Sequence, residues 1–424
     1  MGTKTQKLSN VVDQIVEWQS VFTGDGSTGL TAVAGRGYFI DTTSGTVTVT
    51  LPASPKIGDI VQLKDYARTW NTNNLTIAST LFDGSTNAST FSTNGQTLTL
   101  VYMDGTKGWS LINEDTTASL AAQYITATGG TITTSGDYKI HTFTGDGCFV
   151  VSCAGNPAGS DSVDYLVVAG GGAGGRGATN SSGAGAGGGA GGFRESSGAA
   201  SGCYTTSPLG ACVSALPVSA TTYPVTVGGG GTAVSLGANE DDDPAEPGNG
   251  SNSIFSTITS TGGGGGANRS IPSGQTGAPG GSGGGSRCGN TVGAGNTPPV
   301  TPPQGNPGSS TPPASSGGGG GATASGGSFT PTTGAGGGNG ATTSISASPT
   351  AYAGGGAAGG SGCAPIGGTG GTGGGGDGSD ENSGNATAGT TNTGGGGGGG
   401  GGTSPGSVGK NGGKGIVIIR YKFQ

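Results

Sequence analysis

Three groups of residues in this 424-residue chain have types and spacings that could serve chemistry. The first follows a strand-like run: Gly170, Gly172 and Gly175 form a G-x-G-x-x-G pattern, with Glu195 about twenty residues further on, as in dinucleotide-binding sites. That mechanism needs a helix whose amino terminus points at the pyrophosphate, and no helix is predicted after Gly175. Because a glycine tract produces this pattern by chance, we expect no nucleotide cofactor.

The second group is acidic, and carboxylate oxygens are ligands for Ca²⁺. It comprises a run near the middle of the chain and a shorter one near its end: Glu240, Asp241, Asp242, Asp243 and Glu246, then Asp377, Asp380 and Glu381. Neither run has the spacing of an EF-hand loop, and runs of like charge are usually solvated. A solvated acidic loop is therefore the favoured interpretation, and we predict no metal site.

Histidine and cysteine form the third group. The single histidine, His141, lies in the stretch KIHTF, which predicts a packed strand residue. One histidine is too few for a zinc site or a Ser-His-Asp triad to be expected. We predict no catalytic residues and no enzyme, with a hydrolytic depolymerase as the minor enzyme alternative. Cys203 and Cys212 flank a loop that a disulfide could close, and buried free thiols are the other interpretation.

Composition limits both the core and the partners. The chain contains 102 glycines and 21 prolines, and only 30% of its residues are hydrophobic, which excludes one large apolar core. The net charge of −7 disfavours nucleic acid and anionic membranes as partners, because both attract basic surfaces. No apolar run approaches the ~20 residues of a transmembrane helix, so no membrane insertion is expected.

The elements that must position these residues are β-strands. Between residues 21 and 115, short runs of alternating β-branched, aromatic and polar residues are separated by turn residues, as in GYFIDTT, TVTVTLPASP, DIVQLKDYA and NLTIAST. This pattern predicts a small β-sandwich, barrel or β-roll, of which we favour the sandwich or β-roll. The LPASP-x-x-GD turn, Asp65 and Trp109 resemble a β-module found in bacteriophage tail fibres and other virion appendages.

From residue 124 onward, strands alternate with glycine tracts. YLVVA, YPVTV, SIFSTITST and the closing GIVIIRYKF are strand-like, and the last is so apolar that we expect it to be buried beside YLVVA or FVVS. The order HTFTGDG, DYLVVAGGGAGG, YPVTVGGGG, SIFSTITSTGGGGG and GKGIVIIRY resembles the glycine-rich domains of phage fibre and adhesin proteins. The resemblance implies a jelly-roll-like β core joined to a bundle of polyglycine II helices.

The glycine tracts between residues 170 and 415 have two interpretations. By composition alone they would be flexible linkers or disordered. The strands embedded among them must return to one core, however. Without Cβ atoms, extended threefold helices can also lie side by side and pair their N–H and C=O groups. We therefore predict an ordered domain, and an all-β fold class with little or no α-helix.

These patterns divide the chain into an N-terminal arm (1–20), a β-sandwich or β-roll module (21–115), a linker (116–123) and a glycine-rich domain (124–424). The arm, in a short helix or an extended conformation, is predicted to anchor the chain in a virion. Its candidate anchoring residues are apolar: Val11, Val12, Ile15 and Trp18.

The resemblance implies a bacteriophage virion appendage protein that is assembled in the host cytoplasm and exposed on the particle. Its partners would be other virion proteins, further copies in a homotrimer, and a receptor or glycan on the host surface. A structural capsid, neck or tail component without receptor binding is the alternative, and an ice-binding or silk-like protein ranks last. Recognition is expected in loops between the glycine helices, and the candidate receptor-binding residues are Tyr204, Pro208, Asn239, Asp242, Asn268, Arg269, Tyr352, Asp377 and Asp380.

Overall fold

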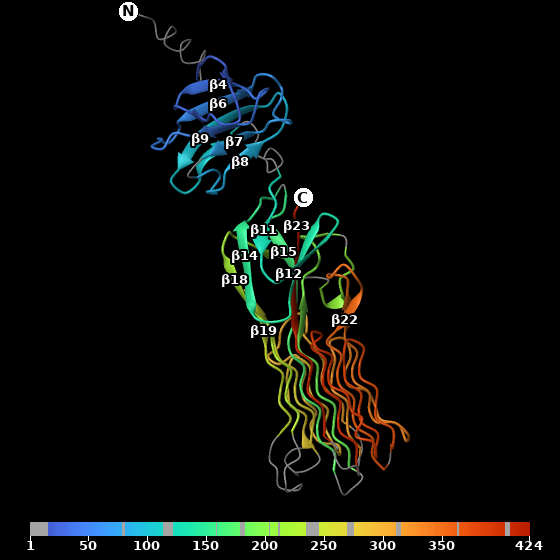
Figure 1. The fold of residues 1–424 in the computed structure, drawn as a ribbon. Coiled ribbons are helices and arrows are strands. Elements are labelled where there is room, and N and C mark those ends of the chain that lie inside the picture. Colours follow the sequence, from blue (N-terminus) through green and yellow to red (C-terminus); the bar gives the residue numbers. More distant parts are fainter. Residues whose placement is uncertain are drawn as a thin grey trace, which may run out of the picture. The chain divides into compact units, whose positions relative to one another are not determined.

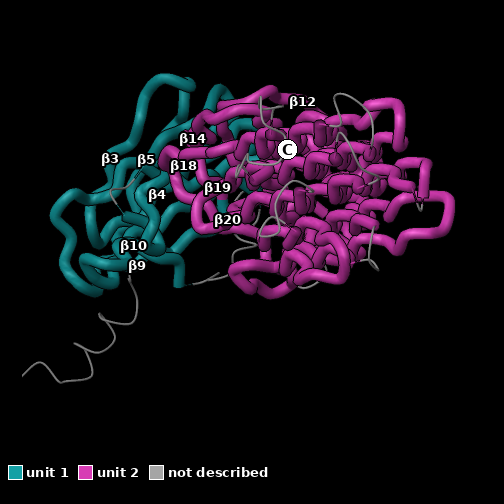
Figure 2. The backbone as a smooth tube through the Cα atoms, turned by 90° about the horizontal axis from the view of Figure 1, so that it is seen from below, with its two compact units in different colours: residues 1–123, 156–159 teal, residues 124–155, 160–424 magenta. Residues whose placement is uncertain are grey.

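The computed structural model describes residues 16–78, 81–112, 122–157, 159–178, 183–202, 204–210, 213–234, 246–268, 275–310, 315–362, 364–402 and 408–424. The chain forms two compact units, residues 1–123 with 156–159 and residues 124–155 with 160–424 (Figure 2). The described elements are β-strands and the short 3-10 helix η2 (Pro208–Gly210). The prediction of an all-β chain is therefore confirmed.

In the first unit the chain alternates between two sheets, as in a β-roll. One sheet contains β4 (Arg36–Asp41) and β6 (Ile60–Asp65), and the other contains β5 (Val47–Thr50) and β7 (Leu75–Ala78), each pair parallel. The short parallel strands at the start are β1 (Glu17–Trp18) and β2 (Phe22–Thr23) on β4, and β3 (Leu30–Thr31) on β5. The antiparallel strands are β8 (Ser89–Phe91), β9 (Thr97–Asp104) and β10 (Gly108–Leu111).

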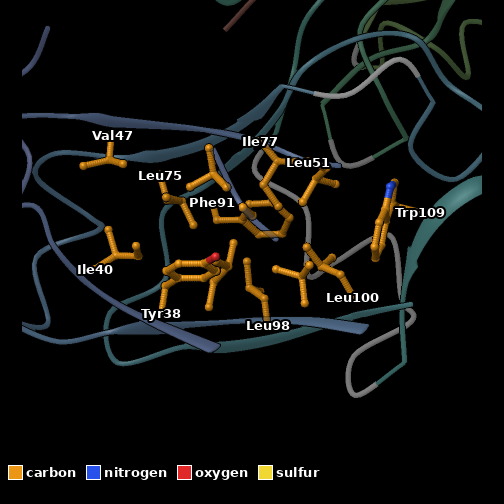
Figure 3. Close-up of a cluster of buried hydrophobic side chains, with 14 of the residues drawn as sticks. Tyr38, Ile40, Val47, Leu51, Leu75, Ile77, Phe91, Leu98, Leu100 and Trp109 are labelled. Carbon is orange, nitrogen blue, oxygen red and sulfur yellow. The ribbon is translucent and has the colours of Figure 1, made fainter. Parts of the chain in front are cut away.

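Alternating side chains build the core of this unit. In β5, Val47 and Val49 are buried while the threonines between and after them are exposed. The inward side chains of both sheets meet in one apolar cluster that includes Tyr38, Leu75 and Phe91 (Figure 3). Side chains alternate with period two in parallel and antiparallel strands alike, so the sequence pattern indicates the strands but not their direction.

Two packed sheets form the β core of the second unit. The outer sheet contains, in order, β11 (Thr126–Thr128), β14 (Gly147–Cys153), β18 (Thr222–Thr226), β19 (Ser253–Phe255) and β20 (Ile258–Ser260). The central sheet contains β12 (Thr131–Ser135), β13 (Tyr138–Phe143), β23 (Ile416–Lys422), β15 (Ser162–Val168) and β16 (Phe193–Glu195). The remaining strands are β17 (Leu216–Pro217), which pairs with β15, and the hairpin of β21 (Ala341–Thr343) and β22 (Thr350–Tyr352).

The C-terminal strand β23 lies in the middle of the central sheet, between β13 and β15. It pairs antiparallel with β15, with Ile418 opposite Leu166, which confirms the predicted burial beside YLVVA. One face of the central sheet packs against the outer sheet around Phe149 and Phe255. The other face packs against the β21–β22 hairpin through residues such as Tyr352.

His141 on β13 is fully buried, as predicted for a packed strand residue. Its Nδ1 lies 2.7 Å from the carbonyl oxygen of Gly129, and its Nε2 lies 3.1 Å from the Tyr421 hydroxyl. Because a carbonyl can only accept, Nδ1 carries the proton and Nε2 accepts from Tyr421. Burial lowers the pKa of the imidazole.

The glycine tracts run side by side away from the β core (Figure 1). In the tract of residues 170–178, successive N–H groups donate to three different segments, and the pattern repeats every three residues. The first three bonds run from Gly170 to Ser251, from Gly171 to Gly413 and from Gly172 to Gly189. The next three run from Ala173 to Gly248, from Gly174 to Lys410 and from Gly175 to Ala186. A three-residue repeat is the symmetry of a polyproline II-type helix, here made of glycine.

Six segments surround this tract. Three accept its N–H groups and run antiparallel to it, and three others donate to its carbonyl groups through Gly263, Gly231 and Gly397. At many glycine positions of this lattice of tracts a side chain does not fit; a Cβ on Gly170, for example, would lie 2.0 Å from the carbonyl oxygen of Gly229. The predicted ordered polyglycine II bundle is therefore present, and its glycines serve close backbone contact.

Candidate functional site

Tracts at the edge of the glycine lattice have fewer than six neighbouring tracts. There, side-chain oxygens accept the backbone N–H groups that would otherwise donate to a further tract. The N–H of Gly370 donates to Asp377 Oδ1, and the N–H of Gly367 donates to Asp380 Oδ1, both at 2.8 Å. The two donors are three residues apart in the sequence, and so are the two acceptors. We call this pair of bonds the carboxylate ladder; its spacing matches the three-residue repeat of the glycine helix. The two aspartates replace the carbonyl groups that a further tract would supply.

A second ladder uses asparagine. Gly265 donates to Asn249 Oδ1 at 2.8 Å, and Gly262 donates to Asn252 Oδ1 at 3.0 Å. Single bonds of the same kind run from Ala233 to Asn411 and from Arg176 to Asn268. Sequence reasoning missed this role. Its signal is the i, i+3 spacing of Asn or Asp within glycine tracts, NGSN at 249–252 and DGSD at 377–380.

The solvated acidic loop that the charge pattern favours concerns two runs, and Glu240, Asp241, Asp242 and Asp243 of the first run lie outside the described residues. In the second run the carboxylates also have backbone partners. Asp377 and Asp380 lie at the lattice surface, but one oxygen of each is bonded to a backbone N–H of the next tract. The other oxygen of Asp380 accepts from Asn385 at 3.3 Å. These carboxylates therefore hold two tracts together.

The described candidate residues do not form one site. Asn268, Asp377 and Asp380 lie in the glycine lattice, whereas Tyr204, Pro208 and Tyr352 lie at the β core. Asn268 and Tyr352 are buried, Tyr204 is half-buried and Pro208 is exposed. The other three candidates, Asn239, Asp242 and Arg269, lie outside the described residues.

Turns at the lattice end away from the β core carry side chains that the tracts lack. Among the described turns, residues 380–385 are fixed by their own polar groups. The N–H of Asp380 donates to Asn385 Oδ1 at 2.9 Å, and the Ser383 hydroxyl donates to the same oxygen at 2.7 Å. Asn382 and Ser383 are exposed. This turn thus presents polar side chains on a bonded backbone.

Two carboxylates are buried near the meeting point of β15, β16 and β21. Asp164 accepts from the hydroxyls of Ser196 and Ser201 at 2.7 and 2.6 Å. Glu195 accepts from the Thr343 hydroxyl and from the Ser207 N–H, and burial raises its pKa. The exposed fractions of the two residues are 0% and 2%, so a substrate cannot reach them. Their hydrogen bonds instead fasten the segment after β16 and the β21–β22 hairpin to the central sheet.

The described end of the predicted arm belongs to the β-roll. Glu17–Trp18 forms β1, and the Trp18 ring stacks on Phe39 with centroids 4.5 Å apart. Gly37 lies beneath the indole, where a Cβ would approach it to 2.7 Å. Trp18 is therefore seated on the module, although 40% of it remains exposed. The other candidate anchoring residues, Val11, Val12 and Ile15, lie outside the described residues.

The remaining groups that could serve chemistry lie partly within the part of the chain that the structure describes. No three His, Cys, Asp or Glu residues gather there as a metal site would require. No helix there has the length and apolar character needed to cross a membrane. Cys148, Cys153 and Cys288 are free thiols, and Cys203 and Cys212 lie outside the described residues. A half-open cavity of about 270 Å³ beside Tyr102 and Trp109 has no carboxylate, histidine or cysteine in its lining.

A two-sheet β core that carries an ordered lattice of glycine helices defines the second unit as a glycine-rich domain. The chain belongs to the glycine-rich domain family, whose profile matches residues 144–422. That range begins directly after β13 and ends with the last residue of β23, so it includes the whole lattice. A comparison with curated proteins finds no match.

Proposed function

We propose that this chain is a structural appendage of a bacteriophage particle, of the tail-fibre or adhesin type. In this proposal the N-terminal region attaches to other virion proteins, and the glycine-rich domain is exposed on the particle. That domain recognises a receptor or glycan on the host surface. The chain acts as a binding and structural protein, without a catalytic step, and assembles as a homotrimer.

The observation that carries this proposal is the glycine lattice. Backbone hydrogen bonds on six sides fix a central tract, so the turns between tracts stand on a rigid support. Binding residues are commonly found on loops that a rigid scaffold positions. The bonded turn at residues 380–385, with exposed Asn382 and Ser383, is the described example.

Binding of the labelled full chain to a panel of bacterial cells tests host recognition. We expect saturable binding to one group of cells and weaker binding when residues 381–383 are replaced by glycine and serine. The matched control replaces Thr391 and Asn392, in a turn at the other end of the lattice, by glycine. A folded chain that joins particles yet binds no cells would favour the alternative, a structural component without receptor binding.

A test of attachment to the particle needs a deletion that leaves the β-roll intact. Removal of residues 1–20 would also remove β1, which pairs with β4. Deletion of residues 1–15 spares that strand. We expect this shorter deletion to reduce incorporation into particles, and normal incorporation would contradict the anchoring role of the arm.

A further inference from the structure

One large side chain belongs to the central glycine tract, that of Arg176. The other residues of the tract at 170–178 are glycine or alanine, and Arg176 is only 2% exposed. Its N–H continues the row of donors formed by Gly170 and Ala173, whose bonds reach backbone carbonyl groups. The acceptor for the Arg176 N–H is instead Asn268 Oδ1, at 2.8 Å. At the level of Arg176, a side-chain oxygen therefore takes the place of the neighbouring backbone.

The Arg176 guanidinium finds no acceptor in the described part of the chain. Its Nε and Nη1 are buried, and neither has a hydrogen-bond partner. Two further arginines of the second unit are buried among the described residues, and both have partners. Arg287 donates from Nε to the Ser316 hydroxyl at 2.9 Å. The Arg420 guanidinium lies over the Tyr138 ring, 4.6 Å from its centroid. The side chain of Arg176 lacks a partner of either kind.

A buried guanidinium without a partner requires a counterion. Arginine stays protonated in proteins, so the group cannot become neutral. Burial of an unpaired charge is strongly unfavourable, and buried charges are usually paired or bound to an ion. We propose that the folded second unit binds one small oxyanion, such as phosphate, sulfate or a carboxylate, at the Arg176 guanidinium. The planar set of N–H donors matches the oxygens of such anions, and charge strengthens these hydrogen bonds.

The burial of Arg176 makes this anion a structural component of the glycine lattice. A guanidinium that is 2% exposed cannot be reached by a receptor on a cell surface. The anion therefore enters while the glycine tracts assemble and leaves only when they open. A ligand that binds the folded state alone stabilises that state by mass action. This inference depends neither on host recognition nor on attachment to a particle.

Thermal unfolding of the full chain tests the site, after refolding in phosphate, sulfate or acetate at about 0.1 to about 10 mM and constant ionic strength. The midpoint of the second unit should rise by about 2–4 °C for each tenfold increase in at least one of these anions. The first unit, which holds all three tryptophans, is an internal control and should not respond. A wild-type midpoint of the second unit that is independent of all three anions overturns the proposal.

Two matched variants assign the effect to one arginine. Arg176→Met removes the charge at similar side-chain length and should abolish the dependence on anion concentration. Arg194→Met changes a half-buried arginine of β16 and should leave that dependence intact. Equal behaviour of the two variants overturns the proposal.

Ion chromatography of wild-type protein gives a second readout that does not depend on a variant folding. The full chain is refolded in inorganic phosphate, desalted and then unfolded, and the released phosphate is measured. The same measurement is made after refolding in sulfate and in acetate. We expect close to one equivalent of anion per chain in at least one case. Release of none of the three anions overturns the proposal.

A competing counterion is the chain's own acidic run at 240–243, which lies outside the described residues. The triple variant Asp241→Asn, Asp242→Asn and Asp243→Asn removes most of its charge. The proposal expects this variant to keep the dependence of the unfolding midpoint on anion concentration. A loss of stability that Arg176→Met cancels would show that these carboxylates pair with Arg176, and would overturn the proposal.

Discussion

At the scale of single residues, the one histidine of the chain is informative because its surroundings fix its protonation state. His141 is buried, and its two ring nitrogens are bonded to Gly129 and Tyr421. Protonation of Nε2 would remove the acceptor of the Tyr421 hydroxyl and place a charge in the core. The folded protein therefore prefers the neutral ring, and its imidazole pKa is lowered by burial.

This preference predicts that the second unit loses stability in mild acid. In the unfolded chain the imidazole pKa is near 6.5, so below about pH 6.5 the unfolded state binds more protons than the folded state. The contribution of His141 to stability should be complete above that pH and should fall by up to about 1.4 kcal/mol per pH unit below it. Thermal unfolding from pH 7.5 down to about pH 5 measures the effect.

The matched control for this prediction is His141→Gln, whose amide can donate and accept but does not titrate. Because the chain has a single histidine, this variant should show a flatter pH dependence in the same range. Glu195, whose pKa burial raises, shifts stability in the opposite direction but is present in both proteins. An equal pH dependence of wild type and His141→Gln would therefore contradict the prediction.

At the scale of elements, the ladders of Asn and Asp decide where the lattice ends. A glycine helix offers N–H groups in three directions, so an outermost tract has donors that face no further tract. Side-chain oxygens of residues i and i+3 accept hydrogen bonds from these donors. They belong to Asp377 and Asp380 in one ladder, and to Asn249 and Asn252 in the other. The ladders thus give the lattice a defined edge, where further glycine backbone would otherwise find free donors.

The carboxylate ladder predicts a difference between two kinds of substitution. Asp377→Ala and Asp380→Ala should each lower the free energy of unfolding of the second unit by about 1 kcal/mol or slightly more, since each removes the hydrogen bond to the neighbouring tract and Asp380→Ala also removes the longer one from Asn385. The Asn variants keep the Oδ1 acceptor and should lose less than half as much.

Amide hydrogen exchange of the peptide that contains Gly367 and Gly370 checks this prediction. Its exchange should accelerate in the Ala variants and stay close to wild type in the Asn variants. Equal effects of Ala and Asn would show that the acceptor atom does not matter, which would contradict the role given to the ladder.

At the scale of the whole molecule, the two units have separate cores and separate optical probes. All three tryptophans, Trp18, Trp70 and Trp109, belong to the first unit. The lattice of the second unit depends on close backbone contact. A Cβ on Gly398 would lie 1.9 Å from the carbonyl oxygen of Asp377, while a Cβ on Gly229 would meet no atom within 4 Å.

We therefore predict two unfolding transitions in calorimetry, one for each unit, and tryptophan fluorescence should follow only that of the first unit. Gly398→Ala should destabilise the second unit by about 3 kcal/mol or more, since two backbone segments cannot move aside. Gly229→Ala should change it by no more than about 0.5 kcal/mol. A fluorescence midpoint that shifts together with the calorimetric one in Gly398→Ala would show that the units unfold as one, contrary to the prediction.

The sequence by itself determined the strands and the order of the glycine tracts. Alternating residues indicate β5 and β7, and the apolar run of β23 requires burial, which the pairing with β15 satisfies. Long stretches without Cβ atoms allow close contact between backbones, and they carry no side chains that could form other contacts. These properties are local, so a pattern of residue types is enough to reveal them.

Only the tertiary structure decided which segments meet. A glycine tract has no side-chain pattern to specify a neighbour, so the bond from Gly172 to Gly189 cannot be inferred from composition. Parallel pairing in the β-roll was hidden for a related reason, since alternation is the same in both directions. The roles of Asp377 and Asp380 depend on a backbone that the three-dimensional lattice brings beside them. Neighbour identity is a long-range property, and the side chains that would encode it are missing from most of this domain.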